Sequence, residues 1–343
     1  MPARILIVSD AWQPQVNGVV RTLATVAAEL RGLGHTVEVI GPDRFRTLPL
    51  PTYPDIRISL LPRRRLARMI EAFEPDALHI ATEGPLGQAA RGWALKRGCA
   101  FTTAFHTRFP EYLHARTGIP PKLIYGWMRR FHAAGQGTMV ATASLREELE
   151  QRGFSRIRSW SRGVDLSQFR VELRAGGDAE LDDLPRPLFL YVGRVAVEKN
   201  IRTFLDLDLP GSKAVVGGGP QLAELQRDYP GVRFTGARHG EALARAYAQG
   251  DVFVFPSLTD TFGLVILEAL ACGTPVAAFP VTGPKDVLAQ PAGCVGAVDV
   301  DLQAACLAAL AADRGAARAH AEKFSWRACA ETFLSHLVPL GGH

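Results

Sequence analysis

The sequence has no long hydrophobic run. Among its 343 residues the apolar stretches are strand-length or interrupted, which predicts that no helix spans a membrane. The N-terminus enters an apolar stretch at once, without the pattern of a secretory leader, so we expect none. The five cysteines are odd in number, scattered, and form no Cys-x-x-Cys pair, which is typical of reduced thiols. We therefore expect a cytoplasmic protein.

A dinucleotide fingerprint is also missing. The turn after the first predicted strand, residues 4–9, does not read Gly-x-Gly-x-x-Gly. This absence argues against a nicotinamide or flavin dehydrogenase. Nor does the sequence mark any side chain as an assured nucleophile.

What the sequence does contain is a repeated strand–helix pattern. Residues 4–9 form a continuous apolar run, residues 19–30 have helical spacing, and residues 36–40 form the next strand. Strand, helix and strand in this order predict a βαβ unit, and hence an α/β fold with a parallel, doubly wound sheet. The pattern starts again at strand 187–192 in a chain longer than one average domain, so we expect two such domains.

Charge is divided unevenly along the chain. Residues 1–165 hold 23 lysines and arginines against 14 acids, whereas residues 166–343 hold 16 against 20. A basic half predicts contact with an anionic surface, either nucleic acid or a membrane leaflet. The densest basic patch consists of Arg57, Arg63, Arg64, Arg65 and Arg68. Alternatively, this patch is only a solvated face.

The stretch 260–276 combines acids with an apolar helical pattern. Asp260 and Glu268 are eight residues apart, which is a little over two helical turns. We expect Asp260 to precede the helix and Glu268 to lie within it, so that both can meet one elongated ligand. Leucine and alanine flank Glu268, where a carboxylate is costly unless it is paired, and the adjacent hydroxyls of a polyol suit it. Alternatively, Glu268 faces solvent on an amphipathic helix.

A family resemblance rests on Asp260-x7-Glu268 and the residues after it. This pattern resembles the acid-x7-Glu signature of retaining glycosyltransferases of family 4, also called glycosyl transferases group 1. The family more often has Glu at the first position. The resemblance implies the GT-B fold, with two facing Rossmann-like domains and a cleft between them. It also implies that Glu268 binds the nucleotide ribose and that Asp260 sits by the donor sugar. The following residues that match are Ala269, Gly273, Thr274 and Pro275.

A second motif, Gly193-Arg194-x4-Lys199, follows strand 187–192. The glycine frees the turn for close backbone approach, and the two cations suit a departing pyrophosphate; two surface cations are the alternative interpretation. The motif resembles the family's Gly-Arg-x4-Lys, which implies that Arg194 and Lys199 stabilise the leaving phosphates. We expect the rest of the donor site to include Gly218, Gly219, Arg233, Phe234, Phe262, Gly263 and Leu264.

Two residues of the first half are placed like ligand-binding residues. Gly18 opens a predicted helix and can let a phosphate approach backbone N–H groups, although a plain loop glycine is the alternative. His106 follows strand 99–105, where open α/β sheets bind ligands, although a lone histidine is more often structural. The surrounding string FHTRFPEYL resembles lipid-directed and mannose-type members of family 4, which implies that His106 reaches the donor sugar. We expect the acceptor side to include Glu83, Arg108, Glu111 and Tyr112.

Three local patterns predict single elements of the first half. Residues 119–133 interleave apolar and basic side chains, which predicts either an interfacial amphipathic helix or an ordinary helix packed on its own domain. Ser144-x-x-Glu147 is a predicted capping box. Residues 41–65, rich in proline and arginine, are predicted to form a long connection.

These patterns together predict a glycosyltransferase that moves a hexosyl group from a UDP- or GDP-sugar to an acceptor hydroxyl. Arg194 and Lys199 would act electrostatically, and Asp260 and His106 would orient the sugar. Retention of configuration is implied by the resemblance. The expected divisions are a first domain at 1–165, a connector at 166–186, a nucleotide-sugar domain at 187–325, and a C-terminal helix at 326–343 that crosses back to the first domain.

Two features of the sequence bear on the identity of the acceptor: the basic first half and the region around Trp127. Both favour a membrane lipid, and thus glycolipid synthesis by a peripheral protein on the inner face of the cytoplasmic membrane. The alternatives are an α-mannosyltransferase with a soluble or polysaccharide acceptor, a sugar-nucleotide epimerase and a non-catalytic sugar-nucleotide-binding protein. No nucleic-acid-binding module is recognised. The acidic triplets 206–208 and 299–301 do not lie among the phosphate motifs, so we expect no obligatory metal and no other cofactor.

Overall fold

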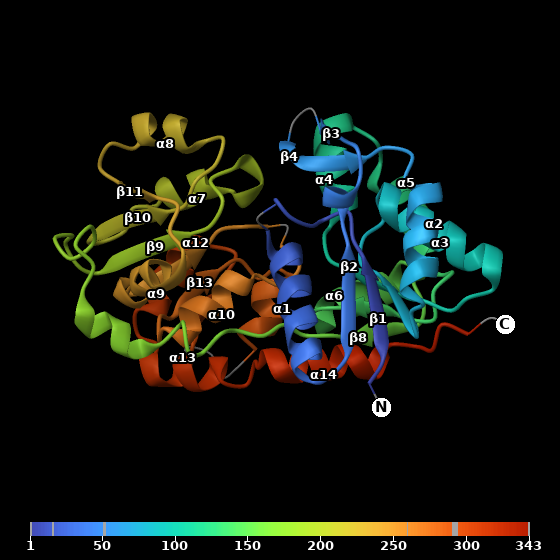
Figure 1. Cartoon of the computed structure of the whole chain (residues 1–343). Coiled ribbons are helices and arrows are strands. Elements are labelled where there is room, and N and C mark those ends of the chain that lie inside the picture. Colours follow the sequence, from blue (N-terminus) through green and yellow to red (C-terminus); the bar gives the residue numbers. More distant parts are fainter. Residues whose placement is uncertain (1, 16, 51–52, 259, 290–293, 342–343) are drawn as a thin grey trace. The chain divides into compact units, whose positions relative to one another are not determined.

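A computed structural model describes residues 2–15, 17–50, 53–258, 260–289 and 294–341. The chain divides into two compact units (Figure 1). Each unit has its own hydrophobic core. Unit 1 consists of Met1–Arg162 and Trp326–His343, and unit 2 is Gly163–Ser325. The expected connector, residues 166–186, therefore lies inside unit 2.

Unit 1 is built on a six-stranded parallel sheet with the order β2-β1-β5-β6-β7-β8. Its strands are short apolar runs, and β1 buries four of its five residues because helices cover both faces of the sheet. The strands are β1 (Arg4–Val8), β2 (Thr36–Ile40), β5 (Ala77–Ile80), β6 (Thr102–Phe105), β7 (Thr138–Val140) and β8 (Ile157–Ser159). The helices are α1 (Gly18–Gly32), α2 (Arg63–Phe73), α3 (Pro85–Arg97), α4 (Phe109–Thr117), α5 (Pro121–His132), α6 (Ala143–Gln151) and α14 (Trp326–His336), with the 3₁₀ turn η1 (Pro42–Arg44).

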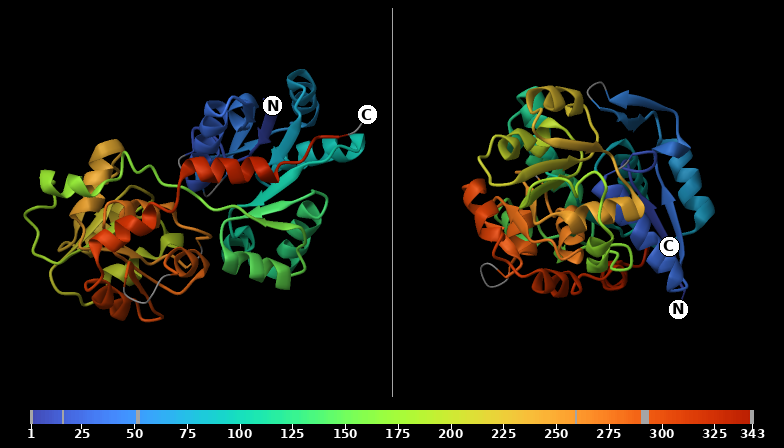
Figure 2. Two further views of the ribbon diagram at one scale, coloured as in Figure 1. Left: turned by 90° about the horizontal axis from the view of Figure 1, so that it is seen from below. Right: turned by 90° about the vertical axis from the view of Figure 1, so that its left-hand side faces the viewer.

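The C-terminal helix α14 belongs to unit 1 although the whole of unit 2 precedes it in the chain. It packs along α1, as Figure 2 also shows. Its Phe333 is fully buried and stacks near Trp160, with ring centroids 5.0 Å apart. The core of unit 1 is therefore completed only by the end of the chain.

Unit 2 repeats the plan with a six-stranded parallel sheet in the order β11-β10-β9-β12-β13-β14. Numbered along the chain, this is the 3-2-1-4-5-6 order of a doubly wound nucleotide-binding sheet. The strands are β9 (Leu188–Val192), β10 (Ser212–Val216), β11 (Arg233–Gly236), β12 (Val252–Phe255), β13 (Val276–Ala278) and β14 (Gly296–Val298). The helices are α7 (Ile201–Leu205), α8 (Leu222–Asp228), α9 (Gly240–Gln249), α10 (Leu264–Ala271), α11 (Thr282–Val287), α12 (Leu302–Ala309) and α13 (Arg314–Ala321), with the 3₁₀ turns η2 (Val171–Gly176) and η3 (Val197–Lys199).

The predicted α/β fold with two parallel sheets is confirmed, but two local predictions are wrong. Residues 41–65 are not a plain connection, because they contain the antiparallel hairpin β3 (Thr47–Leu50) and β4 (Tyr53–Ser59). A separate two-stranded sheet tolerates the proline at position 49, whereas a central strand would not. Ser144 does not cap α6: Thr142 has an extended backbone, and its hydroxyl accepts the N–H of Leu145.

Candidate active site

The loops after β9 and β12 meet where the strand order of unit 2 reverses. These strands are neighbours, yet the chain continues from β9 to β10 on one side and from β12 to β13 on the other. Open α/β sheets bind ligands beyond the carboxyl ends of their strands at such a switch point. Asn200 ties the two loops together, because its side-chain amide donates to the Pro256 carbonyl at 3.1 Å.

Lys199 and Asp260 form a charged pair at this point. The lysine Nζ lies 2.7 and 2.8 Å from the two carboxylate oxygens of Asp260. Lys199 ends η3 after β9, and Asp260 follows β12. Their side chains are 23% and 21% exposed, so solvent screens the pair only in part. A ligand phosphate that enters here meets a lysine whose charge is already balanced, and it must share or displace the carboxylate.

Glu268 lies inside α10, as predicted, and it is buried. It is 3% exposed, and its Oε2 accepts a hydrogen bond from the Tyr247 hydroxyl at 2.8 Å. The alternative interpretation, a solvent-facing Glu268, is therefore wrong. A carboxylate accepts several hydrogen bonds, and the tyrosine supplies one of them. Gly263 starts the helix at φ +84°, a conformation that favours glycine.

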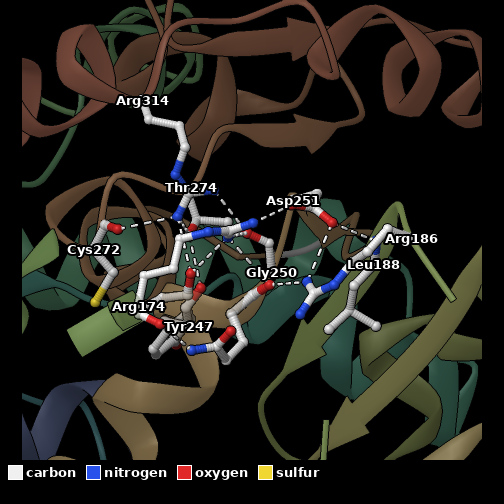
Figure 3. A network of polar contacts seen from close by, with 11 residues as sticks. Arg174, Arg186, Leu188, Tyr247, Gly250, Asp251, Cys272, Thr274 and Arg314 are labelled. Atoms are coloured by element: carbon white, nitrogen blue, oxygen red, sulfur yellow. Dashed lines mark hydrogen bonds and ion pairs between the residues drawn. The ribbon is translucent and has the colours of Figure 1, made fainter. Parts of the chain in front are cut away.

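A polar network holds the helix that carries Tyr247 (Figure 3). Thr274, part of the signature after Glu268, donates its hydroxyl to the Tyr247 carbonyl at 2.7 Å. Arg174 and Arg314 donate to the Ala248 carbonyl, at 2.9 and 3.0 Å, near the C-terminus of α9. Cations at a helix C-terminus are favourable, because the last carbonyls lack partners within the helix. The network thereby fixes Tyr247 against Glu268.

Close packing of two loops explains Gly219, which was predicted for the donor site, and its neighbour Gly217, which was not. A Cβ at Gly217 would lie 1.8 Å from the carbonyl oxygen of Gly193, and one at Gly219 would lie 2.3 Å from that of Val195. The loops after β9 and β10 therefore approach too closely for any side chain at these two positions. Gly218 is different, because the nearest atom to its Cβ would be 3.7 Å away, an ordinary contact.

Arg194 comes directly after Gly193 in the same loop, and its side chain is half-buried. Its carbonyl accepts the hydroxyl of Tyr191 at 2.8 Å, which holds the loop against β9. Leu264, the first residue of α10, is also half-buried. The motif residues 193, 194 and 199 thus lie on one short loop at the switch point.

Three predicted donor residues have structural partners elsewhere in unit 2. Arg233 forms an ion pair with Asp183 at 3.0 Å, on the edge strand β11. Phe234 is partly buried against the hydrophobic core of unit 2. Phe262 is buried edge-on against Phe324, with ring centroids 6.5 Å apart.

In unit 1, His106 follows β6 as predicted and contacts Arg162. The guanidinium Nη2 lies 3.3 Å from the His106 Nδ1, and the histidine ring meets Trp160 edge-on with centroids 5.7 Å apart. Burial, together with the cation of Arg162, holds the pKa of His106 well below its usual 6.5. The ring is therefore neutral near pH 7.

Gly18 is the first residue of α1, at a helix start as predicted. The N-cap is Asn17, whose side-chain oxygen accepts the N–H groups of Val19 and Val20, both at 3.0 Å. The side chain of Asn17 thus already binds two of the N–H groups that we expected a phosphate to approach.

The predicted acceptor residues fall into two groups. Glu83 accepts from the Nε2 of buried His132 at 3.0 Å, and the other ring nitrogen contacts the Thr103 hydroxyl at 2.9 Å. Arg108 and Glu111 belong to a separate network around α4–α6.

In this second network Arg108 pairs with Glu148, and it lies 3.9 Å from Glu111. Glu111 also accepts the hydroxyl of Tyr125 at 2.8 Å. The side chain of Tyr112 lies outside the described residues.

An apolar groove, here called the α4–α5 groove, runs between α4 and α5. Its volume is about 330 Å³, and its lining residues are Phe109, Leu113, Ile119, Leu123, Ile124 and Trp127. Leu123 is 66% exposed and Trp127 is 44% exposed, although α5 also buries Met128 and Phe131. Residues 119–133 therefore pack on their own unit with one face and present a second apolar strip to solvent.

Comparison with known proteins identifies the family. The family model described as Glycosyltransferase Family 4 matches residues 16–168, and the model for Glycosyl transferases group 1 matches residues 186–313. A GDP-mannose-dependent alpha-mannosyltransferase of Mycobacterium tuberculosis is 32% identical over 307 residues, which cover 83% of this chain and 81% of that protein. The chain belongs to glycosyltransferase family 4.

Other similarities agree with this assignment. The sulfoquinovosyl transferase SQD2 of Arabidopsis thaliana is 30% identical, over 95% of this glycosyltransferase and 72% of that protein. Among solved structures, sucrose-phosphate synthase from Thermosynechococcus elongatus aligns with a TM-score of 0.73 and 22% identity, over 97% of this chain and 98% of that one. At this identity the structural likeness shows the fold alone, and the predicted GT-B class is confirmed.

Two polar residues of the glycosyltransferase were not predicted from the sequence. Asp10, which follows β1, accepts the N–H of Leu86 at 2.8 Å and the Thr82 hydroxyl at 2.9 Å, and burial raises its pKa to about 6. An acid directly after the first strand is a signal that could have found it. Tyr247 has no such signal, because only the packing of α9 on α10 brings its hydroxyl to Glu268.

The acidic triplet 299–301 has local partners. Asp301 caps α12 by accepting the N–H of Gln303 at 2.9 Å, and Asp299 accepts the N–H of Asp301 at 2.9 Å. Within the described ranges, no three histidines, cysteines or acids are grouped to hold a metal, and no helix is long and apolar enough to cross a membrane. Independence from metal stays a prediction.

Proposed function

We propose that this glycosyltransferase moves a hexosyl group from a nucleoside-diphosphate sugar to a hydroxyl of a membrane-lipid acceptor, with GDP-mannose as the first donor to test. The observation that supports it best is the Lys199–Asp260 pair at the switch point of unit 2, in the same unit as the buried carboxylate of Glu268. The Lys199–Asp260 pair is suited to a diphosphate and its sugar, and the Glu268 carboxylate is suited to a ribose.

The leaving diphosphate would bind at the N-terminus of α10. Gly263 caps this helix without a side-chain hydrogen bond, so its first N–H groups suit an anion. Lys199 and Arg194 add positive charge on the loop after β9. Because negative charge grows on the leaving phosphate as the glycosidic bond breaks, these groups bind the transition state more tightly than the ground state.

Glu268 would accept two ribose hydroxyls while Tyr247 holds its other oxygen. Asp260 would orient the sugar within unit 2, and the acceptor hydroxyl would attack from the face that the phosphate leaves. Retention of configuration is the expected outcome. The family resemblance supports it, and the identity of the anomer in the product would test it.

The relatives favour a GDP-mannose donor. The alpha-mannosyltransferases of Mycobacterium tuberculosis and Mycolicibacterium smegmatis, both 32% identical to this chain, are named as GDP-mannose-dependent. A thermal-shift panel of GDP-mannose, UDP-glucose and UDP-galactose tests this, because a ligand of the native state raises the melting temperature. We expect GDP-mannose to give the largest shift and a UDP-sugar to give less.

Two variants make this test specific. Lys199→Met should abolish the shift, whereas Arg202→Met should keep it, because Arg202 lies three residues further on and pairs with Glu224 at the surface. Equal shifts in both variants, or none with any nucleotide sugar, would refute the donor site.

The α4–α5 groove supports a lipid acceptor. Exposed Lys122, Arg129 and Arg130 flank its exposed Leu123 and Trp127, so apolar and cationic side chains occur together on α5. Such a helix suits an anionic membrane surface. Named relatives include an alpha-monoglucosyldiacylglycerol synthase of Streptococcus pneumoniae, 26% identical to this chain.

Vesicle sedimentation tests the lipid surface. We expect salt-sensitive binding to anionic vesicles that Trp127→Ser weakens, whereas Leu307→Ser, a change at a 43% exposed leucine on α12, leaves it intact. Equal binding to neutral vesicles, or no binding, would favour a soluble acceptor. Chromatography of the nucleotide and the acceptor separates transfer from epimerisation and from simple binding. Only transfer releases free nucleoside diphosphate and also glycosylates the acceptor.

A further inference from the structure

The α4–α5 groove is walled by two pairs of apolar side chains. Phe109 and Leu113 are four residues apart on α4, so they lie on one face of that helix. Leu123 and Trp127 have the same spacing on α5. The other two lining residues come from the turn that joins the helices and from the buried side of α5, namely Ile119 and Ile124. Every side chain that lines the groove is therefore largely apolar.

Four large side chains of this lining remain in contact with solvent. Phe109 is 42% exposed, Ile119 41%, Trp127 44% and Leu123 66%. Apolar surface gains free energy when it leaves water, and several such side chains at one place mark a surface that a ligand or a partner covers. The packing of α4 on α5 therefore does not by itself explain the groove.

The chemistry of the lining suits a hydrocarbon chain. Apart from the indole N–H of Trp127, the lining side chains offer no hydrogen bond. A peptide or a nucleobase would leave most of its polar groups unpaired in the groove, which is costly, whereas a hydrocarbon has none. The volume of about 330 Å³ lies near the lower end of the usual range for small-molecule sites, about 300–1,000 Å³.

Cations on α5 flank the groove. Lys122, Arg129 and Arg130 are exposed, and each lies within three residues of a groove-lining residue in the sequence. The helix α5 contains no acidic residue. Positive charge of this density favours an anionic group at the end of the bound chain.

The acid on the α4 side has partners of its own. Glu111 accepts the hydroxyl of Tyr125 at 2.8 Å and lies 3.9 Å from the guanidinium of Arg108. Its charge is therefore partly balanced within unit 1, and the cations of α5 decide the sign of the charge beside the groove.

We propose that the α4–α5 groove binds a single hydrocarbon chain of an anionic amphiphile, and that this chain belongs to the acceptor. This inference rests on the proposed function, in which the acceptor is a membrane lipid. It goes beyond adsorption to a membrane surface, because one chain leaves the bilayer and enters a site of limited volume. The groove thereby holds the acceptor on unit 1 and selects chains that fill it.

Single-chain amphiphiles test the groove without a membrane and without a donor. The probes are alkyl phosphates from octyl to hexadecyl, titrated calorimetrically into the full chain below the concentration at which each forms micelles. We expect one molecule bound per protein, with an affinity that rises about fourfold per methylene until the groove is full and then levels off. Inorganic phosphate should not bind measurably, and the uncharged alkyl alcohol of each length should bind more weakly.

A matched pair of variants locates the site. Leu123 is 66% exposed on α5, and Leu95 is 48% exposed on α3 in the same unit, so neither is a core residue. Leu123→Asn should weaken the binding of dodecyl phosphate on the order of tenfold, whereas Leu95→Asn should bind it like the wild type. Unchanged melting temperatures would show that both variants fold. Binding only above micelle formation, an affinity that rises through the longest chain, or equal binding by the two variants would overturn the inference.

Transfer assays separate this inference from the proposed function. With acceptors that share one headgroup, KM should fall as the chain lengthens, whereas kcat should not change. Equal kcat/KM for the headgroup alone would overturn the role of the groove while transfer itself stands. A protein that binds one alkyl phosphate in the groove but glycosylates no lipid would refute the proposed function alone.

Discussion

The two units place different groups at equivalent points of similar sheets. In unit 2 the helix that follows β12 at the switch point, α10, starts at Gly263 without a side-chain cap. In unit 1 the helix that follows β5 beside β1, α3, receives the Asp10 carboxylate on its first N–H groups, at 2.8 Å from Leu86 and 3.2 Å from Gly87. The chain's own carboxylate thus binds the helix start in unit 1, whereas in unit 2 the cap residue Gly263 makes no side-chain hydrogen bond.

The strand orders of the two sheets also differ. Unit 2 has the full 3-2-1-4-5-6 strand order, whereas unit 1 has 2-1-3-4-5-6 when its parallel strands are numbered along the chain. In unit 1 the chain forms the β3–β4 hairpin and α2 between β2 and β5, where unit 2 forms α8, β11 and α9 between β10 and β12. The 3-2-1-4-5-6 topology and the helix start at Gly263 occur together in unit 2, which supports our proposal that the donor site lies in this unit.

The strongest test of this comparison is Lys199→Met. The substitution removes the cation that the leaving phosphate would meet, so we expect kcat to fall by roughly 10²–10³. Steady-state transfer of labelled sugar measures the effect, with Arg202→Met as the control that should stay near wild type. If kcat falls less than threefold in Lys199→Met, the phosphate does not bind at the switch point of unit 2.

Asp10→Ala tests the other side of the comparison. Removing the carboxylate leaves the N–H groups at the start of α3 without their partner, so we expect unit 1 to lose about 1–3 kcal/mol. Hydrogen exchange across α3 measures the loss, and donor affinity should not change. A weakened donor affinity at unchanged stability would show that Asp10 serves the ligand instead of the fold.

Unit 1 buries His79, so we expect this histidine to make the stability of unit 1 depend on pH. Burial lowers the pKa of His79 to about 3, so below about pH 6.5 the unfolded chain binds a proton that the folded chain does not. Its contribution to the free energy of unfolding therefore falls as pH falls, by about 2 kcal/mol between pH 7 and pH 5. Asp10 acts in the opposite direction, because its raised pKa of about 6 makes the folded chain take up a proton that the unfolded chain lacks. Its contribution to the free energy of unfolding therefore rises as pH falls from about 6 to about 4.

Comparison with His79→Gln isolates the contribution of His79 to the pH dependence of the free energy of unfolding. Urea unfolding of both proteins at pH 7 and pH 5 should show that the variant loses about 2 kcal/mol less than the wild type on acidification. Parallel losses in the two proteins would mean that His79 takes up its proton while folded.

Tyr247→Phe should have the smallest effect. It removes one hydrogen bond to Glu268 and keeps the aromatic packing, so we expect donor affinity to fall about fivefold, or about 1 kcal/mol. Calorimetric titration with the donor measures it, and Tyr229→Phe, whose hydroxyl contacts Asp206 at 2.5 Å, is the control. If the two variants bind the donor equally well, Tyr247 has no role in positioning Glu268.

Much of the fold was predictable from local patterns. The apolar runs at 4–9 and 187–192 became β1 and β9, and Glu268 lies within a helix that Asp260 precedes, because periodicity and length decide such elements. The hairpin β3–β4 was missed because its prolines and arginines look like those of a connection. Thr142 was overlooked as a cap because both it and Ser144 are good capping residues, and only backbone geometry distinguishes them.

By itself the sequence determined the two parallel sheets, their strands, and the spacing of the motifs on the loops that follow β9 and β12. Only the tertiary structure decided which polar groups meet. Lys199 pairs with Asp260 across 61 residues, Glu268 with Tyr247 across 21, and His106 with Arg162 across 56. The physical reason is that short-range patterns specify backbone conformation, whereas the pairing of side chains depends on how strands order in a sheet and helices pack upon it.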